Sequence, residues 1–421
     1  MRIWTSVIGQ RLDDAQNTRS MLLCDALLKR GHEVVMWTSA YDHIHKKWRP
    51  EWREAHGGPF IMDNGLEVRF MKGCGYSKNM SPRRFLDHWL CGRDFLRQAS
   101  DLPAPDAVVA SIPDHLTADA LVKFARRART AAIVDVRDKW PDIFIDYAQQ
   151  PMLRAMVRLA LLSERRRAAR TLGDADAIVG MMGSMVEWGL ERAGRPSGEE
   201  DRVFYLTTAE KNFGEAPVPD IDPASDAAAA IQATEGRIVF SFTGTFNRTQ
   251  HPLILLDALD ILKKRNDPAL DRASFIIGGG GVDADRVRTR AAKHENVALA
   301  GWLKSNEMAA ILRASDVGLL LMNFPSPAFN NKAFSYLASG IPIINCATGD
   351  LADLLTENEA GMNVRGGDAL GLAEAISKLT LDDALRTRMR GNIRVAYDRF
   401  FDRDANYIDY AKHIERVIAM R

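Results

Sequence analysis

Two asparagines and a lysine in the second half of the chain have the types and spacing of an anion site. The segment Val317–Asn345 reads VGLLLMNFPSPAFNNKAFSYLASGIPIIN, which predicts an apolar strand, a loop, a helix that begins at Asn330 or Asn331 with Lys332 in its first turn, and a second apolar strand. The first N–H groups of a helix have no partner inside the helix and lie at the positive end of its dipole, so a phosphate bound there is hydrogen-bonded and charge-matched. Short amide side chains also suit the cap position. An ordinary junction between a loop and a helix, with a solvated lysine, fits the same residues, so the surrounding motifs must decide.

Two glycine-containing segments in the same half could bring the backbone close to such an anion. In IVFSFTGTFNR, Gly244 and Thr245 directly follow a predicted strand, where a residue without a side chain lets the backbone approach a ligand. Arg248 stands nearby and either pairs with a diphosphate through its planar guanidinium or is a solvated surface arginine. A second strand, SFIIGGGG, ends in four glycines that include Gly279 and Gly280. This run lacks the spacing of a dinucleotide-binding fingerprint and by itself indicates a flexible turn.

In the first half, polar residues follow two predicted strands. VVASIPDH places His115 just beyond a strand, and we expect it to face a cleft, although a histidine there is more often a surface or capping residue. IVDVRDKWPD places Asp138 beyond the next strand, where its carboxylate could bind hydroxyl groups or cap a helix.

A group of basic residues lies near the start of the chain. Arg19 is on the first predicted helix, and His43 follows the second predicted strand together with His45, Lys46 and Lys47. The H-x-H spacing suggests a metal site, but no third ligand follows at a suitable spacing, so we prefer a basic rim.

Arg154–Arg170, RAMVRLALLSERRRAAR, is predicted to be one basic amphipathic helix. Such a helix could rest on an anionic membrane surface. We favour the alternative, a helix that covers the sheet and exposes its arginine face to water.

The elements that must position these residues follow from length, composition and pattern. At 421 residues the chain suits two domains, and its 46% apolar and 26% charged residues are typical of globular proteins. A net charge of +1 argues against a nucleic-acid binder. The four scattered cysteines are expected to be reduced core residues, and the chain has neither a signal-peptide pattern nor an apolar run of membrane-spanning length. We therefore expect a cytoplasmic protein.

Short apolar strands alternate with amphipathic helices along the whole chain, which predicts an α/β fold with parallel sheets. Thr18–Arg30 is one such helix, with a threonine cap and a stop at Gly31. The pattern breaks in a Pro-, Asp- and Ala-rich stretch and then resumes. The expected organisation is a first doubly wound, Rossmann-like domain at 1–206, a linker at 207–235, a second such domain at 236–400 and a closing helix at 401–421, with ligands at the carboxyl ends of strands facing a cleft.

FNNKAFSYLASGIPII, preceded by ILRASDVGLLLM and followed by GDLADLLTENEAGMNV, resembles the donor-binding core of family GT4 of the retaining glycosyltransferases with the GT-B fold. That family has two glutamates in an E-x7-E pattern, and this chain has Pro327 and Ser335 at those positions. The roles of the two glutamates therefore cannot be carried over. The N-x-K helix start resembles a branch that acts in bacterial surface-polysaccharide assembly.

The resemblance implies that the C-terminal domain binds a nucleoside-diphosphate-sugar, that the N-terminal domain binds a sugar or lipid-linked acceptor, and that the last helix crosses back onto the first domain. It implies transfer to an acceptor hydroxyl with retention, without a metal or other cofactor and with possible contact with the inner membrane. The implied site has catalytic residues His115, Lys332 and Arg248, acceptor-side residues Arg19, His43 and Asp138, and donor-binding residues Gly244, Thr245, Gly279, Gly280, Trp302, Phe329, Asn330, Asn331 and Ser335. Trp302 could cover the base or simply pack.

Three other functions remain open or are disfavoured. A nucleotide-sugar 2-epimerase shares this architecture but needs carboxylate acid/base residues, which the serine at position 335 does not supply. A catalytically inactive nucleotide-binding partner of a polysaccharide-assembly complex is also consistent with the missing glutamates. An NAD-dependent dehydrogenase is disfavoured, because its first strand should lead into a glycine-rich turn and IGQRLDDAQN contains one glycine.

Overall fold

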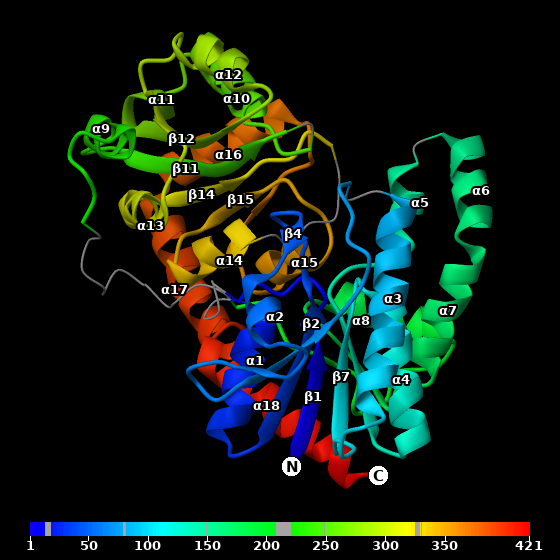
Figure 1. The fold of residues 1–421 in the computed structure, drawn as a ribbon. Helices are drawn as coiled ribbons and strands as arrows, with labels where there is room; N and C mark the ends of the chain where they lie inside the picture. Colours follow the sequence, from blue (N-terminus) through cyan, green and yellow to red (C-terminus); the bar gives the residue numbers. More distant parts are fainter. Residues whose placement is uncertain are drawn as a thin grey trace. The chain divides into compact units, whose positions relative to one another are not determined.

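The chain forms two compact units in a computed structural model that describes residues 1–12, 18–78, 81–148, 150–207, 220–247, 249–324, 329 and 331–421. Unit 1 consists of Met1–Leu206 together with Arg403–Arg421, and unit 2 consists of Thr207–Asp402. Figure 1 shows the elements of both units, and each is described here by itself.

Unit 1 is built on one mainly parallel sheet. Its strand order is β10-β9-β8-β7-β1-β2-β6-β5, and β5 pairs antiparallel to β6 whereas the other neighbours pair in parallel. The strand order reverses between β1 and β7. The strands are β1 Arg2–Ser6, β2 Glu33–Ser39, β5 Phe60–Ile61, β6 Glu67–Met71, β7 Ala107–Ile112, β8 Ala131–Val136, β9 Ala177–Gly180 and β10 Arg202–Val203, and a separate hairpin joins β3 Tyr41–Asp42 to β4 Lys47–Trp48.

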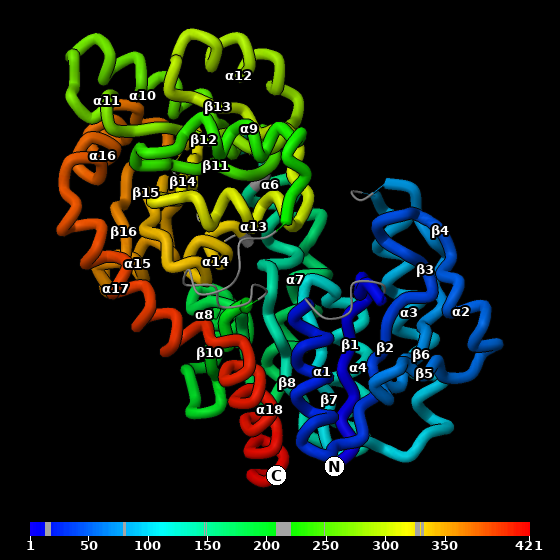
Figure 2. The backbone as a smooth tube through the Cα atoms, turned by 90° about the vertical axis from the view of Figure 1, so that its left-hand side faces the viewer, coloured from blue at the N-terminus to red at the C-terminus, as the bar shows by residue number. Residues whose placement is uncertain are grey.

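Helices cover both faces of the unit 1 sheet. Helices α1 and α18 pack together over one face, where Met21, Leu27 and Ile414 share a core, and Figures 1 and 2 show the two helices side by side. Helices α3, α4 and α8 contribute to the core on the other face. The helices of unit 1 are α1 Arg19–Lys29, α2 Pro50–Glu54, α3 Pro82–Ala99, α4 His115–Ala128, α5 Ile143–Tyr147, α6 Pro151–Ala160, α7 Leu162–Gly173, α8 Gly183–Ala193 and α18 Arg403–Ala419.

Unit 2 has a six-stranded parallel sheet of order β13-β12-β11-β14-β15-β16. In chain order within the unit this is 3-2-1-4-5-6, the Rossmann arrangement, and it reverses between β11 and β14. The strands are β11 Ile238–Phe246, β12 Ala273–Gly281, β13 Val297–Gly301, β14 Val317–Leu320, β15 Ile343–Asn345 and β16 Gly361–Asn363.

The helices of unit 2 also lie on both faces of its sheet. Helices α9 and α13 share a small core with β11, β12 and β13, and α10 packs against α12 and α16 elsewhere in the unit. The helices are α9 Asp226–Ala233, α10 Leu253–Lys264, α11 Ala269–Arg272, α12 Ala284–Ala291, α13 Ser305–Ala314, α14 Asn331–Ala338, α15 Asp350–Glu357, α16 Ala369–Leu381 and α17 Asp383–Phe400.

Three features differ from the sequence expectation. Helix α9 lies inside the stretch expected to be a linker, because Ser225 caps it and its alanines at 227 and 230 are buried. The single helix expected at 154–170 is two helices, α6 and α7, that meet at Leu161. The hairpin of β3 and β4 was not predicted, since strands of two residues carry too little alternation to detect.

Candidate functional site

The carboxyl ends of β11 and β14 mark the point in unit 2 where ligands are expected. These two strands are neighbours in the sheet, and the strand order reverses between them. In open α/β sheets such a reversal leaves a crevice beyond the strand ends, and ligands bind there. Helix α14, which follows β14, begins at Asn331 as predicted. The predicted anion-binding helix start therefore lies in the part of unit 2 that topology favours.

Lys332 reaches from the first turn of α14 to the end of β11. Its Nζ lies 4.3 Å from the centre of the Phe242 ring, a cation–π distance. A Cβ added to Gly244 would come within 2.5 Å of that Nζ, so the absent side chain of this glycine makes room for the ammonium group. The lysine is partly buried and its stem packs on β11, which argues against the alternative of a solvated side chain.

The Lys332 ammonium group lacks a compensating negative charge within the described residues. No carboxylate there forms an ion pair with it, and burial lowers its pKa to about 8. Burying a charge without a partner is unfavourable, because the lost hydration is not replaced. A bound diphosphate would supply the missing charge and accept hydrogen bonds from this ammonium and from the N–H groups at the start of α14.

The glycine run at the end of β12 is a paired strand and not the flexible turn that its composition suggested. Gly279 pairs with Gly244 and Gly281 pairs with Phe246, so β11 and β12 stay together to their ends. Gly279 has a φ of +128°, and a Cβ there would lie 1.9 Å from the carbonyl oxygen of Gly244. Glycine is therefore required at position 279 by backbone conformation and by the closeness of the neighbouring strand.

Gly280 and Trp302 form the outer side of the same edge. A Cβ on Gly280 would meet the Trp302 ring at an ordinary contact distance of 3.7 Å. Trp302 follows β13, and its side chain is 73% exposed. Thr245 of β11, which pairs with Gly280, is also exposed. An exposed indole beside glycine backbone is a surface on which a flat ring can stack.

Tyr336, which the sequence analysis did not single out, positions α14. Its buried ring lies against Gly318 in β14, where a Cβ would come within 2.5 Å of the ring. Its hydroxyl donates a hydrogen bond to the carbonyl oxygen of Ser241 in β11 at 2.9 Å, and burial raises its pKa to about 12. One side chain thus attaches α14 to both strands of the reversal. The available signal was a glycine inside an apolar strand, which often marks a close contact.

The remaining predicted donor residues have mixed outcomes. Ser335 is partly buried in α14, and Asn331 is the first residue of this helix. Phe329 is 6% exposed and stacks on Phe334 with 4.5 Å between ring centres. Its ring is therefore a packing group, which corrects the prediction that it contacts the donor. Three residues that the sequence analysis considered lie outside the described residues: Arg248, Pro327 and Asn330.

His115 is buried in unit 1, which corrects the expectation that it faces a cleft. Asp114 caps α4, and His115 is the first residue of that helix. The histidine is 1% exposed, and its Nε2 lies 2.9 Å from Oε2 of Glu164 on α7, whose pKa is lowered by this hydrogen bond. Because Glu164 and nearby aromatic rings hold it inside, His115 offers no accessible group to a ligand in this structure.

Arg19 is also a structural residue and not the predicted acceptor contact. It is 3% exposed and forms a bidentate ion pair with Asp135, with both N–O distances at 3.0 Å. Burial acts to raise the pKa of Asp135, but the charges of Arg19 and Arg137 outweigh it, so this pKa is lowered. Arg19 also donates to the carbonyl oxygen of Phe204, which ties α1 to the end of the sheet.

His43 lies in a cluster at the carboxyl ends of β2 and β6. Its Nδ1 is hydrogen-bonded to the hydroxyl of Tyr76, and burial together with the charge of Arg84 lowers its pKa to about 4, so the ring is neutral near pH 7. The Arg84 guanidinium lies over the Trp140 ring at 4.7 Å. The sequence analysis missed Tyr76, which follows β6, and Arg84, which is in the first turn of α3, because neither belongs to a recognisable motif.

Asp138 follows β8 and is partly buried. Its Oδ1 accepts a hydrogen bond from the backbone N–H of Lys139 at 2.7 Å, and burial raises its pKa. This bond lies in the loop before α5, whose N-cap is Asp142, so Asp138 does not cap that helix. The second carboxylate oxygen leaves room for the predicted role of binding hydroxyl groups, which stays a prediction.

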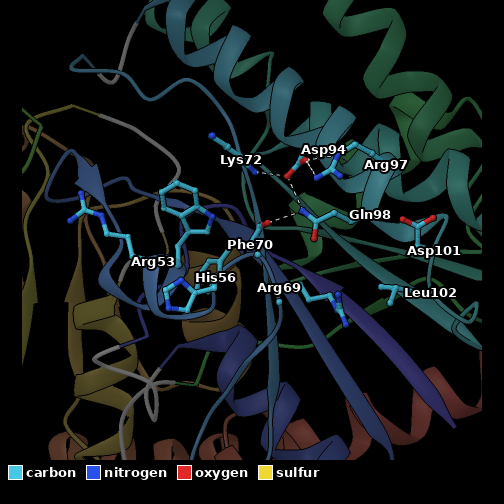
Figure 3. Close-up of a pocket in the computed structure, with 13 residues that line it drawn as sticks. Arg53, His56, Arg69, Phe70, Lys72, Asp94, Arg97, Gln98, Asp101 and Leu102 are labelled. Atoms are coloured by element: carbon cyan, nitrogen blue, oxygen red, sulfur yellow. Dashed lines mark hydrogen bonds and ion pairs between the residues drawn. The ribbon is translucent and has the colours of Figure 1, made fainter.

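A cavity of about 570 Å³ lies at the outer edge of the unit 1 sheet, away from the predicted residues (Figure 3). Asp94 accepts hydrogen bonds there from the backbone N–H of Lys72 and from the Gln98 side chain, both at 2.8 Å. Gln98 also donates to the carbonyl oxygen of Phe70, so these side chains cap the open edge of β6. Figure 3 shows that the cationic ends of Arg53 and Lys72 do not converge. The polar side chains of Asp94 and Gln98 in this cavity are therefore explained by their hydrogen bonds to the sheet edge.

The described residues contain neither a metal-binding cluster nor a membrane-spanning helix. Groups of three or more histidine, cysteine, aspartate or glutamate side chains that could hold a metal ion are absent from this part of the chain, including the H-x-H segment. None of the helices described is both long and apolar enough to cross a membrane.

A known family model matches most of unit 2. Residues 237–382 match the family model described as "Glycosyl transferases group 1". The D-inositol 3-phosphate glycosyltransferases of Corynebacterium jeikeium and Stackebrandtia nassauensis are 29% and 27% identical to this chain over 191 and 210 residues, which are 41% and 46% of the chain. These segments are 44% and 46% of the two relatives, so the chain spans less than half the length of the curated relatives it matches.

Solved structures support the fold over the full chain. The sucrose-phosphate synthase of Thermosynechococcus elongatus is similar with a TM-score of 0.68 at 17% identity, and Anabaena HepE in complex with UDP is similar with a TM-score of 0.65 at 14% identity. Both comparisons cover 100% of each chain. The predicted α/β class, with Rossmann-like parallel-sheet domains as in GT-B structures, is therefore confirmed.

Proposed function

We propose that this protein is a glycosyltransferase that moves a sugar from a nucleoside-diphosphate-sugar to an acceptor hydroxyl. The observation that carries the proposal is the Lys332 ammonium group, which is partly buried beside Gly244, lacks a carboxylate partner in the described part of the chain and has a pKa lowered to about 8. It lies at a helix start and at the reversal in strand order of the unit that matches the group 1 family.

The donor would occupy the edge formed by β11, β12 and α14. Its diphosphate would bind Lys332 and the first N–H groups of α14, and its base would stack on Trp302 beside Gly280. HepE structures with UDP and with UDP-glucose have the same fold, which makes uridine nucleotides the first donors to test. Arg248, Asn330 and Asn331 keep their proposed place around the phosphates.

The proposed reaction breaks the bond between the anomeric carbon and the diphosphate oxygen and forms a bond from the anomeric carbon to the acceptor oxygen. The leaving diphosphate gains negative charge, and groups already arranged to meet that charge provide the main catalytic effect. The acceptor proton passes to the departing phosphate, so the reaction needs no protein nucleophile and would proceed with retention. We propose that it needs no metal, since lysine and the helix start supply the positive charge.

The acceptor would bind unit 1 at the carboxyl ends of β2 and β6. His43, Tyr76 and Arg84 meet there and combine hydrogen-bonding groups with a positive charge, and the aromatic rings suit a sugar. The N-x-K helix start supports an acceptor in bacterial surface-polysaccharide synthesis at the cytoplasmic side of the cell membrane. The curated relatives, named for D-inositol 3-phosphate, add a phosphorylated polyol as a second acceptor class.

A thermal-shift panel of nucleoside diphosphates and nucleotide-sugars, followed by NMR of the products, tests the proposal. We expect one nucleoside diphosphate and its sugar to raise the melting temperature and the sugar to appear on an acceptor hydroxyl. Conversion of the donor to its C2 epimer without an acceptor would instead identify an epimerase. Binding without any turnover would identify an inactive partner, and stabilisation by a dinucleotide alone would refute a nucleotide-sugar site.

A further inference from the structure

Helix α6 exposes an apolar face to solvent. Nine of its ten residues are exposed and the tenth, Val157, is half-buried, so the helix buries no side chain fully. Met152, Met156 and Leu159 are 77%, 61% and 74% exposed. At about 100° per residue these three positions fall within about 60° of one another, which makes one continuous stripe.

The neighbouring helix α7 behaves differently and shows what a covering helix looks like in this chain. Helix α7 packs against α4 and α8 and buries Ala168, Thr171 and Leu172. Helix α6 packs mainly against α5 and α7, the elements next to it in sequence. The covering role favoured by the sequence analysis therefore applies to α7 and not to α6, which Figure 1 shows at the outer side of unit 1.

Helix α6 and the helix that follows it are rich in arginine. The segment from Pro151 to Gly173 contains six arginines and one glutamate, and that glutamate is already paired with His115. Arg158 and Arg166 are exposed and form no ion pair with described residues. By the same 100° per residue, Arg158 lies about 100° beyond Leu159, on the flank of the helix. Positive charge on the flank of a helix that exposes an apolar stripe matches a surface that has anionic groups above an apolar interior.

We propose that α6 docks unit 1 on an anionic lipid surface, with Met152, Met156 and Leu159 inserted among the acyl chains and Arg158 and Arg166 at the headgroups. A second copy of this chain is a poorer partner, because two such faces would bring arginines together. The isolated apolar side chains of most proteins need no explanation, but a stripe of three on one helix is a docking surface. The proposal is independent of glycosyl transfer, since vesicle binding needs neither donor nor acceptor.

Co-sedimentation of the full chain with vesicles of phosphatidylcholine, with and without phosphatidylglycerol, tests the proposal. We expect binding to the anionic vesicles. The triple variant Met152→Ser, Met156→Ser, Leu159→Ser should bind at least about tenfold more weakly, because the favourable burial of each apolar side chain among the acyl chains is lost. The control variant Val282→Ser, Val395→Ser removes equally exposed apolar side chains of unit 2 and should bind as the unchanged protein does.

The charge contribution is tested separately with Arg158→Gln, Arg166→Gln. We expect about 25-fold weaker binding to anionic vesicles, since each of the two arginines near such a surface contributes about fivefold. The control Arg53→Gln, Arg286→Gln removes exposed arginines elsewhere and should have no effect. Circular dichroism should show unchanged melting for all four variants.

Four results would overturn the proposal. These are absence of binding to anionic vesicles, equal binding of the triple serine variant, a fall in its melting temperature, which would show that the stripe is packed, and a dimer in solution that this variant dissociates. The last result would assign the face to a second copy of the chain.

Discussion

Replacing Lys332 with methionine should change nucleotide binding and fold stability in opposite directions. Methionine keeps most of the length and apolar character of the stem that packs on Phe242, so it removes the charge with little loss of packing. Alanine is a poorer probe, because it would also leave space beside Gly244. Opposite signs matter because replacing a residue that only supports the fold would lower both the nucleotide affinity and the stability.

The magnitudes follow from burial and charge. Lowering the pKa of Lys332 from 10.5 to about 8 corresponds to ~3 kcal/mol of penalty for holding the charged form in the folded protein at pH 7. Because the side chain is partly exposed, we expect Lys332→Met to raise the free energy of unfolding by ~1–3 kcal/mol. The lost charge-assisted hydrogen bond to a diphosphate should cost ~1.5–3 kcal/mol of binding, or about 10- to 150-fold in Kd.

Calorimetric titration of the unchanged and variant proteins at pH 7 measures the binding change, with the nucleoside diphosphate chosen from the thermal-shift panel. The matching nucleoside without phosphates is the control, and its affinity should stay the same. Urea titration measures stability. A Kd that changes by less than about threefold would remove Lys332 from the phosphate site, and a fall in stability would refute the claim that its charge is unfavourably buried.

Three further predictions concern the same edge of unit 2. Gly279→Ala should destabilise the fold by ~2–4 kcal/mol in urea titration, because its Cβ would overlap the carbonyl of Gly244, whereas Gly280→Ala should cost less than ~1 kcal/mol; equal losses would contradict the geometry. Trp302→Ala should weaken nucleotide binding about 5- to 100-fold without changing pyrophosphate binding or melting temperature, and a parallel loss of pyrophosphate affinity would show that the indole does not act through the base. Diphosphate affinity should fall as pH rises through about 8, where Lys332 of the folded protein loses its proton. Between about pH 8 and 10.5 the free energy of unfolding should rise with pH, because the unfolded chain still holds that proton. Lys332→Met should show neither trend.

Local patterns in the sequence predicted the elements well. Thr18 caps α1 by accepting from the N–H of Met21 at 3.4 Å, and Gly31 has the left-handed φ of +82° that its place after the helix required. Helix α14 begins where the asparagines and the lysine predicted it. These features depend on residues within a few positions of one another, so spacing alone is informative.

The direction of polar side chains beyond the strands was not predictable in this way. Arg19 turns inward because Asp135, 116 residues away, completes its ion pair, and His115 turns inward because Glu164 lies 49 residues further along the chain. Without knowledge of those partners, a polar residue after a strand looks the same whether it is buried or exposed. The prediction of a flexible turn for the glycine run was wrong for a related reason, since only the pairing of the run with β11 makes it a strand.

Unit 1 contains both the first and the last residues of the described chain, and this has a consequence for biosynthesis. Tyr410 of α18 stacks on Phe204 with 4.3 Å between ring centres, and Ile414 and Val417 complete the core over α1. A ribosome must therefore make residues 207–402, which takes on the order of 10 to 40 s at ~5–20 residues per second, before that core can close. During this delay α1 alone covers that face of the sheet, so the nascent first unit exposes the apolar surface that α18 later buries, and it is then most in need of a chaperone.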